Sequence, residues 1–306
     1  VSVEVAMKMA LQYWMNKGVA GRNRFVSFRG GYHGDTFATM AVCDPDEGMH
    51  AKFAGALATH VIADLPRDAA TLASFRDLLA RHRNELAAII VEPRVQGAGG
   101  MIFHDDNVLR QLRAVADEFG LLLIFDEIFT GFGRTGWMFA CEAAGVLPDI
   151  VTLSKALTGG TLPLAATIAR KHVFEAFLDD DPSKALMHGP TYMGNALACA
   201  AANASLDLFE REPRLQQVAE ISAALQEGLK PCKTIAGVTD VRVLGAIGVV
   251  ELEAIHDRRA LQRAFIERGV WVRPFGNIVY LTPAFTITRD ELASLTSTIC
   301  AVLRGA

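Results

Sequence analysis

The run LLLIFD at residues 121–126 places an acid directly after five apolar residues. Short runs that are apolar on both faces are typical of strands buried on both sides, as in parallel sheets. Comparable runs recur through the first 170 residues, with amphipathic stretches between them; they predict strands at 24–28, 59–63, 87–92, 121–126, 149–154 and 164–169. Repeated β-α-β units of this kind indicate an α/β fold, a mostly parallel sheet with helices on both faces.

The clearest of the intervening helices covers residues 108–119. Its apolar residues recur at helical spacing, Asp105 or Asp106 can cap its start, and Gly120 can end it. After residue 191 the pattern changes, and it predicts helices at 195–211, 214–229, 257–268 and 289–303 with hairpins at 241–252 and 270–281. We therefore expect a large domain over residues 1–212 and a smaller α+β domain over residues 213–306.

Composition narrows the classes of function. The 306 residues carry 30 Lys and Arg against 34 Asp and Glu, a net charge of −4, so no basic surplus indicates nucleic acid or a membrane surface. No apolar run approaches the ~20 residues of a membrane span. The five cysteines have no pair at metal or redox spacing, which suits a reducing compartment. We expect a cytoplasmic protein with no metal centre.

One glycine motif suggests a dinucleotide site. GFGRTG at residues 131–136 matches the G-x-G-x-x-G fingerprint. That fingerprint requires the glycines directly between a strand and a helix. Here residues 127–130 separate the strand end at Asp126 from Gly131, and residues 137–139 lack a clear helix start. A nicotinamide-dependent dehydrogenase is therefore disfavoured.

Asp126 and Lys155 form a more informative pair. Asp126 ends one predicted strand, and Lys155 follows the next. Ligands of open α/β sheets bind outside the carboxyl ends of the strands, so both side chains are expected to project into one crevice. Taken singly, the acid is more readily a helix cap and the lysine a solvated loop residue. Together they suit a carbonyl cofactor such as pyridoxal phosphate, because a lysine amine forms a Schiff base with it and a carboxylate pairs with its ring nitrogen.

Two glycine-containing segments complete such a site. GYHG at residues 31–34 presents an aromatic ring on a glycine turn, and HGPT at residues 188–191 offers a hydroxyl and backbone amides near a helix start, which suits phosphate.

Longer motifs carry a family resemblance. FDEIFTGFGRTG at residues 125–136 and SKALTGG at residues 154–160 resemble the signature of class III aminotransferases, which are pyridoxal-phosphate enzymes of fold type I. The resemblance covers essentially the whole chain. GYHGDT at 31–36, HGPTYMGN at 188–195 and GVWVRPFGN at 269–277 resemble, more narrowly, the biotin-biosynthesis branch of the family. That branch moves an amino group from S-adenosylmethionine to 8-amino-7-oxononanoate and yields 7,8-diaminononanoate.

The resemblance implies cofactor roles for five matching positions. Lys155 would hold pyridoxal 5'-phosphate through a Schiff base and then carry the proton between substrate and cofactor. Asp126 would pair with the pyridine nitrogen. Tyr32 would stack on the ring and touch the substrate, Ile128 would pack on the opposite face, and Gln96 would lie near the phenolic oxygen.

It also implies phosphate and substrate roles. Pro190 and Thr191 would reach the cofactor phosphate of the neighbouring subunit, because these enzymes are homodimers with shared active sites. Gly189 would line the substrate pocket, and Arg273 would bind the substrate carboxylate through both guanidinium nitrogens.

The pocket edge and the start of the chain carry further expectations. Arg134 and Asp35 both lie in motif loops, and we hypothesise that they pair; a surface role for Arg134 is the alternative. The helix beginning at Val1 resembles the one that follows a Gly-Ser phosphate-binding turn in the family. We expect this sequence to lack that turn and the N-terminal segment before it, which places its activity in doubt.

Two alternatives to the biotin-pathway activity stay open. The first is another class III aminotransferase, acting on ornithine, γ-aminobutyrate or β-alanine. The second is an inactive, truncated remnant.

Overall fold

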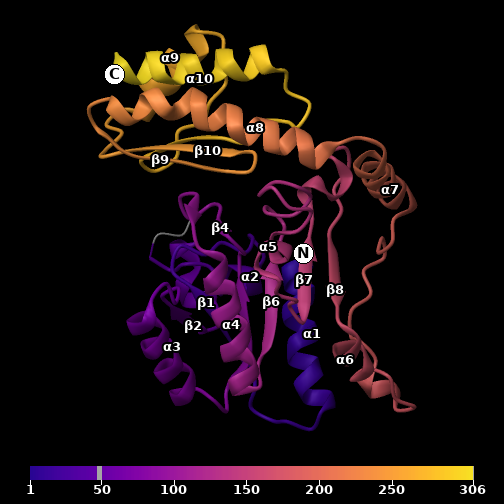
Figure 1. Cartoon of the computed structure of the whole chain (residues 1–306). Helices are drawn as coiled ribbons and strands as arrows, with labels where there is room; N and C mark the ends of the chain where they lie inside the picture. Colours follow the sequence, from indigo (N-terminus) through magenta and orange to yellow (C-terminus); the bar gives the residue numbers. More distant parts are fainter. Residues whose placement is uncertain (47–49, 306) are drawn as a thin grey trace. The chain divides into compact units, whose positions relative to one another are not determined.

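The computed structural model describes residues 1–46 and 50–305. They form two compact units (Figure 1). The first contains Val1–Gly131 and Phe139–Asp207, and the second contains Phe132–Met138 and Leu208–Ala306. The large GFGRTG loop thus contributes most of its residues to the second unit.

The first unit is built on a six-stranded sheet. All six predicted strands lie in it, in the order β2-β1-β3-β6-β7-β8. Their bounds are β1 (Arg24–Phe28), β2 (Val61–Ala63), β3 (Leu86–Val91), β6 (Leu122–Asp126), β7 (Ile150–Leu153) and β8 (Ala166–Ala169). Every neighbouring pair is parallel except β7 and β8, which are antiparallel at the sheet edge. The mostly parallel α/β sheet is therefore confirmed.

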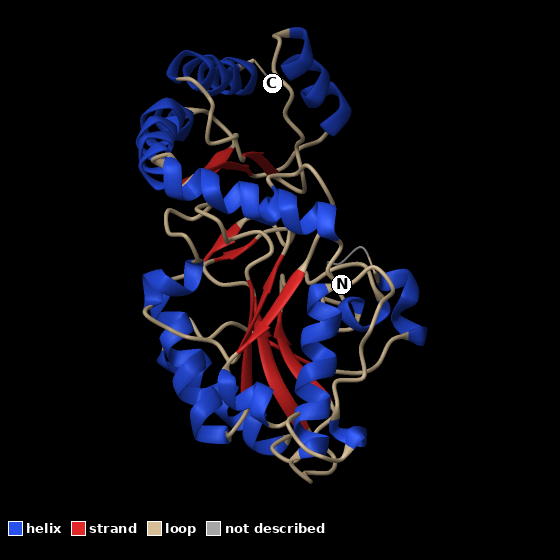
Figure 2. Cartoon of the chain, turned by 90° about the vertical axis from the view of Figure 1, so that its right-hand side faces the viewer, coloured by secondary structure: helices blue, strands red, loops and turns tan. Residues whose placement is uncertain are grey.

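Helices lie on both sides of this sheet (Figure 2). The helices of this unit are α1 (Ser2–Asn16), α2 (Phe37–Met40), α3 (Ala69–Arg81), α4 (Asp106–Phe119), α5 (Ala140–Ala144), α6 (Lys171–Glu175) and α7 (Ala196–Arg211), the last of which continues into the second unit. Short 3-10 helices occur at η1 (Ala51–Ala56), η2 (Lys155–Thr158) and η3 (Pro182–Lys184). A small antiparallel pair, β4 (Val95–Gln96) and β5 (Ile102–Phe103), follows β3.

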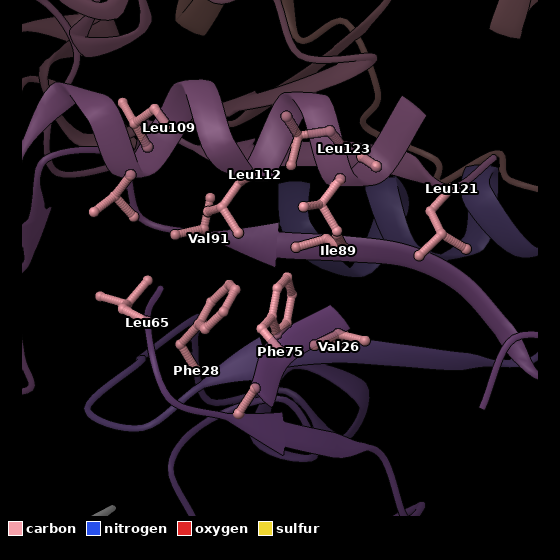
Figure 3. Close-up of a cluster of buried hydrophobic side chains, with 14 of the residues drawn as sticks. Val26, Phe28, Leu65, Phe75, Ile89, Val91, Leu109, Leu112, Leu121 and Leu123 are labelled. Atoms are coloured by element: carbon pink, nitrogen blue, oxygen red, sulfur yellow. The ribbon is translucent and has the colours of Figure 1, made fainter. Parts of the chain in front are cut away.

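Two hydrophobic clusters explain why the strands are apolar on both faces. On one face, Ile89 and Leu123 pack with Phe75 of α3 and Leu112 of α4 (Figure 3). On the other face, the next residues along the same strands, Ile90 and Ile124, pack against Val3, Ala6, Met7 and Ala10 of α1. Successive strand residues point to opposite faces, so each strand needs an apolar residue at nearly every position.

The ends of α4 agree with the sequence. The Asp105 carboxylate accepts a hydrogen bond from the Asn107 backbone N–H at 2.8 Å, which satisfies one of the free donors of the first turn. Gly120 ends the helix in the left-handed conformation with φ of 61°.

The second unit pairs a three-stranded antiparallel sheet with helices. The sheet order is β11-β10-β9. The elements are α8 (Arg214–Leu229), η4 (Lys230–Thr234), β9 (Val238–Leu244), β10 (Ile247–Leu252), α9 (Arg258–Glu267), β11 (Ile278–Leu281) and α10 (Arg289–Arg304). Val250 of β10 packs with Leu225 of α8 and Ile299 of α10 in one buried cluster.

The predicted hairpin at 270–281 is wrong. Only Ile278–Leu281 forms a strand there, and it pairs with β10. Pro274 has no backbone N–H to donate to a ladder, and Phe275 and Ile278 instead exchange two backbone hydrogen bonds of 2.9 and 2.8 Å across a tight turn. The first predicted hairpin, at 241–252, is confirmed as β9 and β10.

Candidate active site

The carboxyl ends of β6 and β7 bring an acid and a lysine to one edge of the sheet. Asp126 is the last residue of β6 and pairs in parallel register with Thr152 of β7. Lys155 follows two residues after the end of β7. The parallel pairing of these strands places both residues at the same edge, as the sequence predicts.

Three donors orient the Asp126 carboxylate, whose side chain is buried. Its Oδ2 atom lies 2.8 Å from Nδ1 of His33, which is itself buried. Its Oδ1 atom accepts hydrogen bonds of 3.2 Å from the Ile128 backbone N–H and from the Thr152 hydroxyl. These contacts fix the direction in which the carboxylate points.

Lys155 has an uncommon backbone conformation. Its φ of 45° lies in the left-handed region, which residues other than glycine rarely adopt. Such strain persists where surrounding structure enforces it, and it concentrates at functional sites. The neighbouring Ser154 hydroxyl donates to the Leu164 carbonyl at 2.7 Å and ties this segment to the loop before β8. The Lys155 side chain is exposed, with Nζ 5.2 Å from the centre of the Phe129 ring.

Tyr32 is held at both ends. Its backbone N–H donates to Glu92 Oε1 at 3.0 Å, and its hydroxyl donates to Asp35 Oδ1 at 2.9 Å. The His50 ring stacks on the Tyr32 ring with centres 5.9 Å apart, and its Nε2 also bonds Asp35 Oδ1 at 2.9 Å. Burial, then the hydrogen bond to Asp35, raise the pKa of Tyr32 well above its usual range, so the phenol stays protonated. Its ring is thereby fixed beside the carboxyl edge of the sheet.

Comparisons with known proteins identify the chemistry of this arrangement. The family model described as "Aminotransferase class-III" matches residues 1–303. The chain belongs to the class III aminotransferase family. It is an enzyme that uses pyridoxal 5'-phosphate for transamination, as members of this family do.

Curated class III relatives are similar over nearly the whole chain. The adenosylmethionine-8-amino-7-oxononanoate aminotransferase of Mycobacterium leprae is 48% identical over 305 residues, which are 99% of this chain and 70% of that protein. The enzyme of the same name from Corynebacterium glutamicum is 42% identical over 310 residues, which are 100% of this chain and 73% of that protein.

Solved structures agree with the fold. The adenosylmethionine-8-amino-7-oxononanoate aminotransferase of Methanocaldococcus jannaschii superposes with a TM-score of 0.92 at 34% identity, covering 100% of this chain and 73% of that one. An amine transaminase from an uncultivated Pseudomonas species, solved with pyridoxal phosphate bound, gives a TM-score of 0.87 at 36% identity, covering 99% and 74%.

The residues at the sheet edge suit pyridoxal phosphate. Lys155 carries a primary amine, the group that forms a Schiff base with an aldehyde, and the buried Asp126 carries a carboxylate, the group that pairs with a protonated ring nitrogen. Tyr32 adds an aromatic ring beside them. Within the described part of the chain, no group of three His, Cys, Asp or Glu is placed to hold a metal ion. Nor does any helix there have the length and apolar character needed to cross a membrane.

Gln96 lies close to the Tyr32 loop. It is buried on β4, and its side-chain amide donates to the Arg29 carbonyl at 2.7 Å. A methyl group placed on Gly30 would lie 3.3 Å from Gln96 Oε1, so the two segments are packed closely. Ile128 is partly buried and packs against the hydrophobic cluster that α1 forms with the sheet.

The loop with Gly189, Pro190 and Thr191 is exposed and precedes α7. Lys8 of α1 holds its start, with Nζ 2.6 Å from the Met187 carbonyl and 3.3 Å from His188 Nδ1. Among the described residues, no hydrogen bond joins Gly189, Pro190 or Thr191 to Asp126 or Lys155. Arg273 lies exposed in the second unit, between α9 and β11.

Each member of the predicted Arg134–Asp35 pair has other partners. Arg134 Nη1 donates to the Ala246 and Pro283 carbonyls, both at 3.0 Å, and its guanidinium lies 4.7 Å from the Phe285 ring centre. Burial lowers the pKa of Arg134 to about 10. These contacts tie the GFGRTG loop into the second unit. The Asp35 carboxylate instead accepts hydrogen bonds from the Tyr32 hydroxyl and from His50 Nε2.

Sequence reasoning missed three residues of the site. His33 bonds Asp126, His50 supports Asp35, and Glu92 holds the Tyr32 backbone. Glu92 had a usable signal, since it follows an apolar strand directly, as Asp126 does. His50 had none, because only the fold brings it to Tyr32.

Proposed function

We propose that the chain transfers an amino group from S-adenosylmethionine to 8-amino-7-oxononanoate and so forms 7,8-diaminononanoate in biotin biosynthesis. The observation that carries this proposal is the placement of Asp126 and Lys155 at adjacent strand ends in a chain that is 48% identical to an enzyme named for these substrates. The two substrates would be handled in turn, in two half-reactions at the same lysine.

The chain's own residues divide the work. Pyridoxal phosphate, when bound, withdraws electrons from the substrate carbon that loses its proton. Lys155 Nζ would hold the cofactor, and its free amine would take and return the proton at that carbon. Asp126 would pair with the ring nitrogen through its carboxylate, whose direction is fixed by His33 Nδ1 at 2.8 Å.

The remaining site residues bind and orient. Tyr32 would stack on the cofactor ring and touch the substrate, Ile128 would pack on the other side of the ring, and Gln96 would lie near the phenolic oxygen. Gly189 would line the substrate pocket. Arg273 would bind the substrate carboxylate, because its planar guanidinium matches two carboxylate oxygens.

We further infer a cytoplasmic homodimer in which Pro190 and Thr191 reach the partner's cofactor phosphate. The exposed loop around these residues supports this assignment. Large apolar side chains gather along it and into α7, with Met187 57%, Tyr192 82%, Met193 66% and Leu197 73% exposed. Apolar area of this kind on one segment is typical of a surface covered by another chain.

The second candidate function is transamination with an amino donor other than S-adenosylmethionine, such as ornithine, γ-aminobutyrate or β-alanine. The similarity to the Pseudomonas amine transaminase favours it, because the 36% identity to that enzyme slightly exceeds the 34% identity to the Methanocaldococcus enzyme. A single half-reaction separates the two. With pyridoxal phosphate bound, S-adenosylmethionine is expected to bleach the visible absorbance of the lysine-bound cofactor, while ornithine, γ-aminobutyrate and β-alanine leave it unchanged. Bleaching by one of these amines, with none by S-adenosylmethionine, would reject the biotin-pathway assignment. A chain that binds the cofactor but responds to none of these four compounds would contradict both assignments.

A further inference from the structure

Glu92 bridges two loops of the candidate site with one carboxylate. It follows β3 directly, and its side chain is buried. Oε1 accepts the Tyr32 backbone N–H at 3.0 Å, and Oε2 accepts the Gly97 backbone N–H at 2.9 Å. Tyr32 and Gln96, the neighbour of Gly97, are the residues assigned above to the cofactor ring and its phenolic oxygen.

The two loops also meet directly beside this carboxylate. The Gln96 side chain donates to the Arg29 carbonyl at 2.7 Å. Gly99 lies so close to Gly30 that an added Cβ would come within 1.8 Å of the Gly30 carbonyl oxygen. This contact is between backbones, which cannot rotate out of the way as a side chain can. The spacing of the Tyr32 and Gln96 loops is therefore tightly set, and Glu92 lies between them.

The main chain at Glu92 is fixed as well. His104 Nε2 donates to the Glu92 carbonyl at 2.8 Å, from a ring that is itself buried. A side chain anchored in this way can act as a rigid spacer. Either loop could leave it only by abandoning a backbone N–H inside the protein, and an unpaired buried donor is costly.

Burial and neighbouring charges also shift the pKa of the Glu92 carboxyl group. Desolvation raises the pKa of Glu92 to about 7, with a further increase from the charge of Asp126. His33 and the two backbone N–H groups act in the opposite direction. The carboxylate thus lies within electrostatic reach of the Asp126–His33 pair.

We propose that Glu92 is a positioning residue for the cofactor site, which holds the Tyr32 ring and the Gln96 amide at one fixed spacing. The proposal rests on the cofactor roles proposed for Tyr32 and Gln96. It requires an acceptor at each carboxylate oxygen. Glutamine has nearly the same shape but would turn an N–H donor toward one of the two backbone N–H groups.

Glu127 provides a matched control. It is also a buried carboxylate that directly follows a strand, and it accepts the Ala140 and Cys141 backbone N–H groups at 2.8 and 2.9 Å. Burial raises its pKa as well. Its bonds secure the start of α5 and hold no backbone N–H of an assigned cofactor residue. Glu127→Gln therefore removes the same kind of interaction from a different place.

The test compares the purified wild type, Glu92→Gln and Glu127→Gln by thermal unfolding, by the dissociation constant of pyridoxal phosphate and by the visible circular dichroism of the bound cofactor. Both variants are expected to unfold at lower temperature. Glu92→Gln alone is expected to weaken cofactor binding by about tenfold, as loss of a buried hydrogen bond implies, and to change the dichroism. These readouts need no substrate, so they remain valid even if the proposed substrates are wrong.

Two results would overturn the proposal. One is a Glu92→Gln protein with wild-type cofactor affinity and dichroism and only a lower unfolding temperature. The other is an equal change in both variants. If Glu92→Gln does not fold, Glu92→Asp takes its place: it keeps the charge but is one methylene shorter, so it is expected to shift the dichroism, and a wild-type spectrum would count against the spacer role.

Discussion

Lys155→Ala is expected to lower the transamination rate with S-adenosylmethionine by at least about 10⁴-fold, because in the proposed mechanism one amine both binds the cofactor and moves the proton. The side chain is exposed and lies over the Phe129 ring without entering the hydrophobic clusters. Stability is therefore expected to change by less than about 0.5 kcal/mol. Steady-state rates together with thermal unfolding measure both effects.

Lys171→Ala is the control for that prediction. Lys171 lies on α6, its side chain is 87% exposed, and it forms an exposed ion pair with Glu175 at 3.5 Å. Removing an exposed pair of this kind has little effect on stability, about 0.5 kcal/mol or less, and we expect the rate to be unchanged. A Lys155→Ala protein that keeps a tenth of the wild-type rate would contradict the assigned role.

Asp126→Asn is expected to lower the rate by about 10³-fold, the scale of losing a preorganised electrostatic partner in a water-excluded site. Asparagine keeps the shape of the side chain and can still accept the Ile128 N–H and the Thr152 hydroxyl. It loses the negative charge that is proposed to pair with the cofactor's ring nitrogen. The neighbouring His33 would also have to change its tautomer, because an amide N–H then faces Nδ1.

Thr152→Val separates charge from orientation. It removes the hydroxyl that lies 3.2 Å from Asp126 Oδ1 but leaves the carboxylate in place. We expect a loss of only a few-fold, the net value of one hydrogen bond. If Asp126→Asn and Thr152→Val reduced the rate equally, the charge of Asp126 would not be the important property.

The strands were predictable because their residues are buried on both faces. Ile89 and Ile90 pack into different clusters on opposite sides of the sheet, so the pattern is continuous and visible in one short window. The pairing of strands is not local. The direction in which β8 runs against the preceding strand β7 is set by packing and not by the residues of β8 alone. The hairpin expected around Pro274 failed because β11 pairs with β10, which lies before α9 in the chain, and because Pro274 has no backbone N–H to donate.

The candidate site was predictable where chemistry coincides with a strand end. Asp126 and Lys155 each follow an apolar run, and the sheet brings their strands together. The support of Tyr32 by His50, and the partners that replace the expected Arg134–Asp35 pair, depend on loop packing. Arg134 donates to the carbonyls of Ala246 and Pro283, more than a hundred residues away in the chain, and no local pattern indicates such partners.

The central claim is that Lys155 is the residue that binds pyridoxal phosphate. Borohydride reduction of the cofactor-loaded protein, followed by peptide mass spectrometry, tests it directly. The account predicts a cofactor-derived mass on the peptide that contains Lys155, and no label in Lys155→Ala. A label on a different lysine of the wild type, or a protein that takes up the cofactor without labelling Lys155, would contradict it.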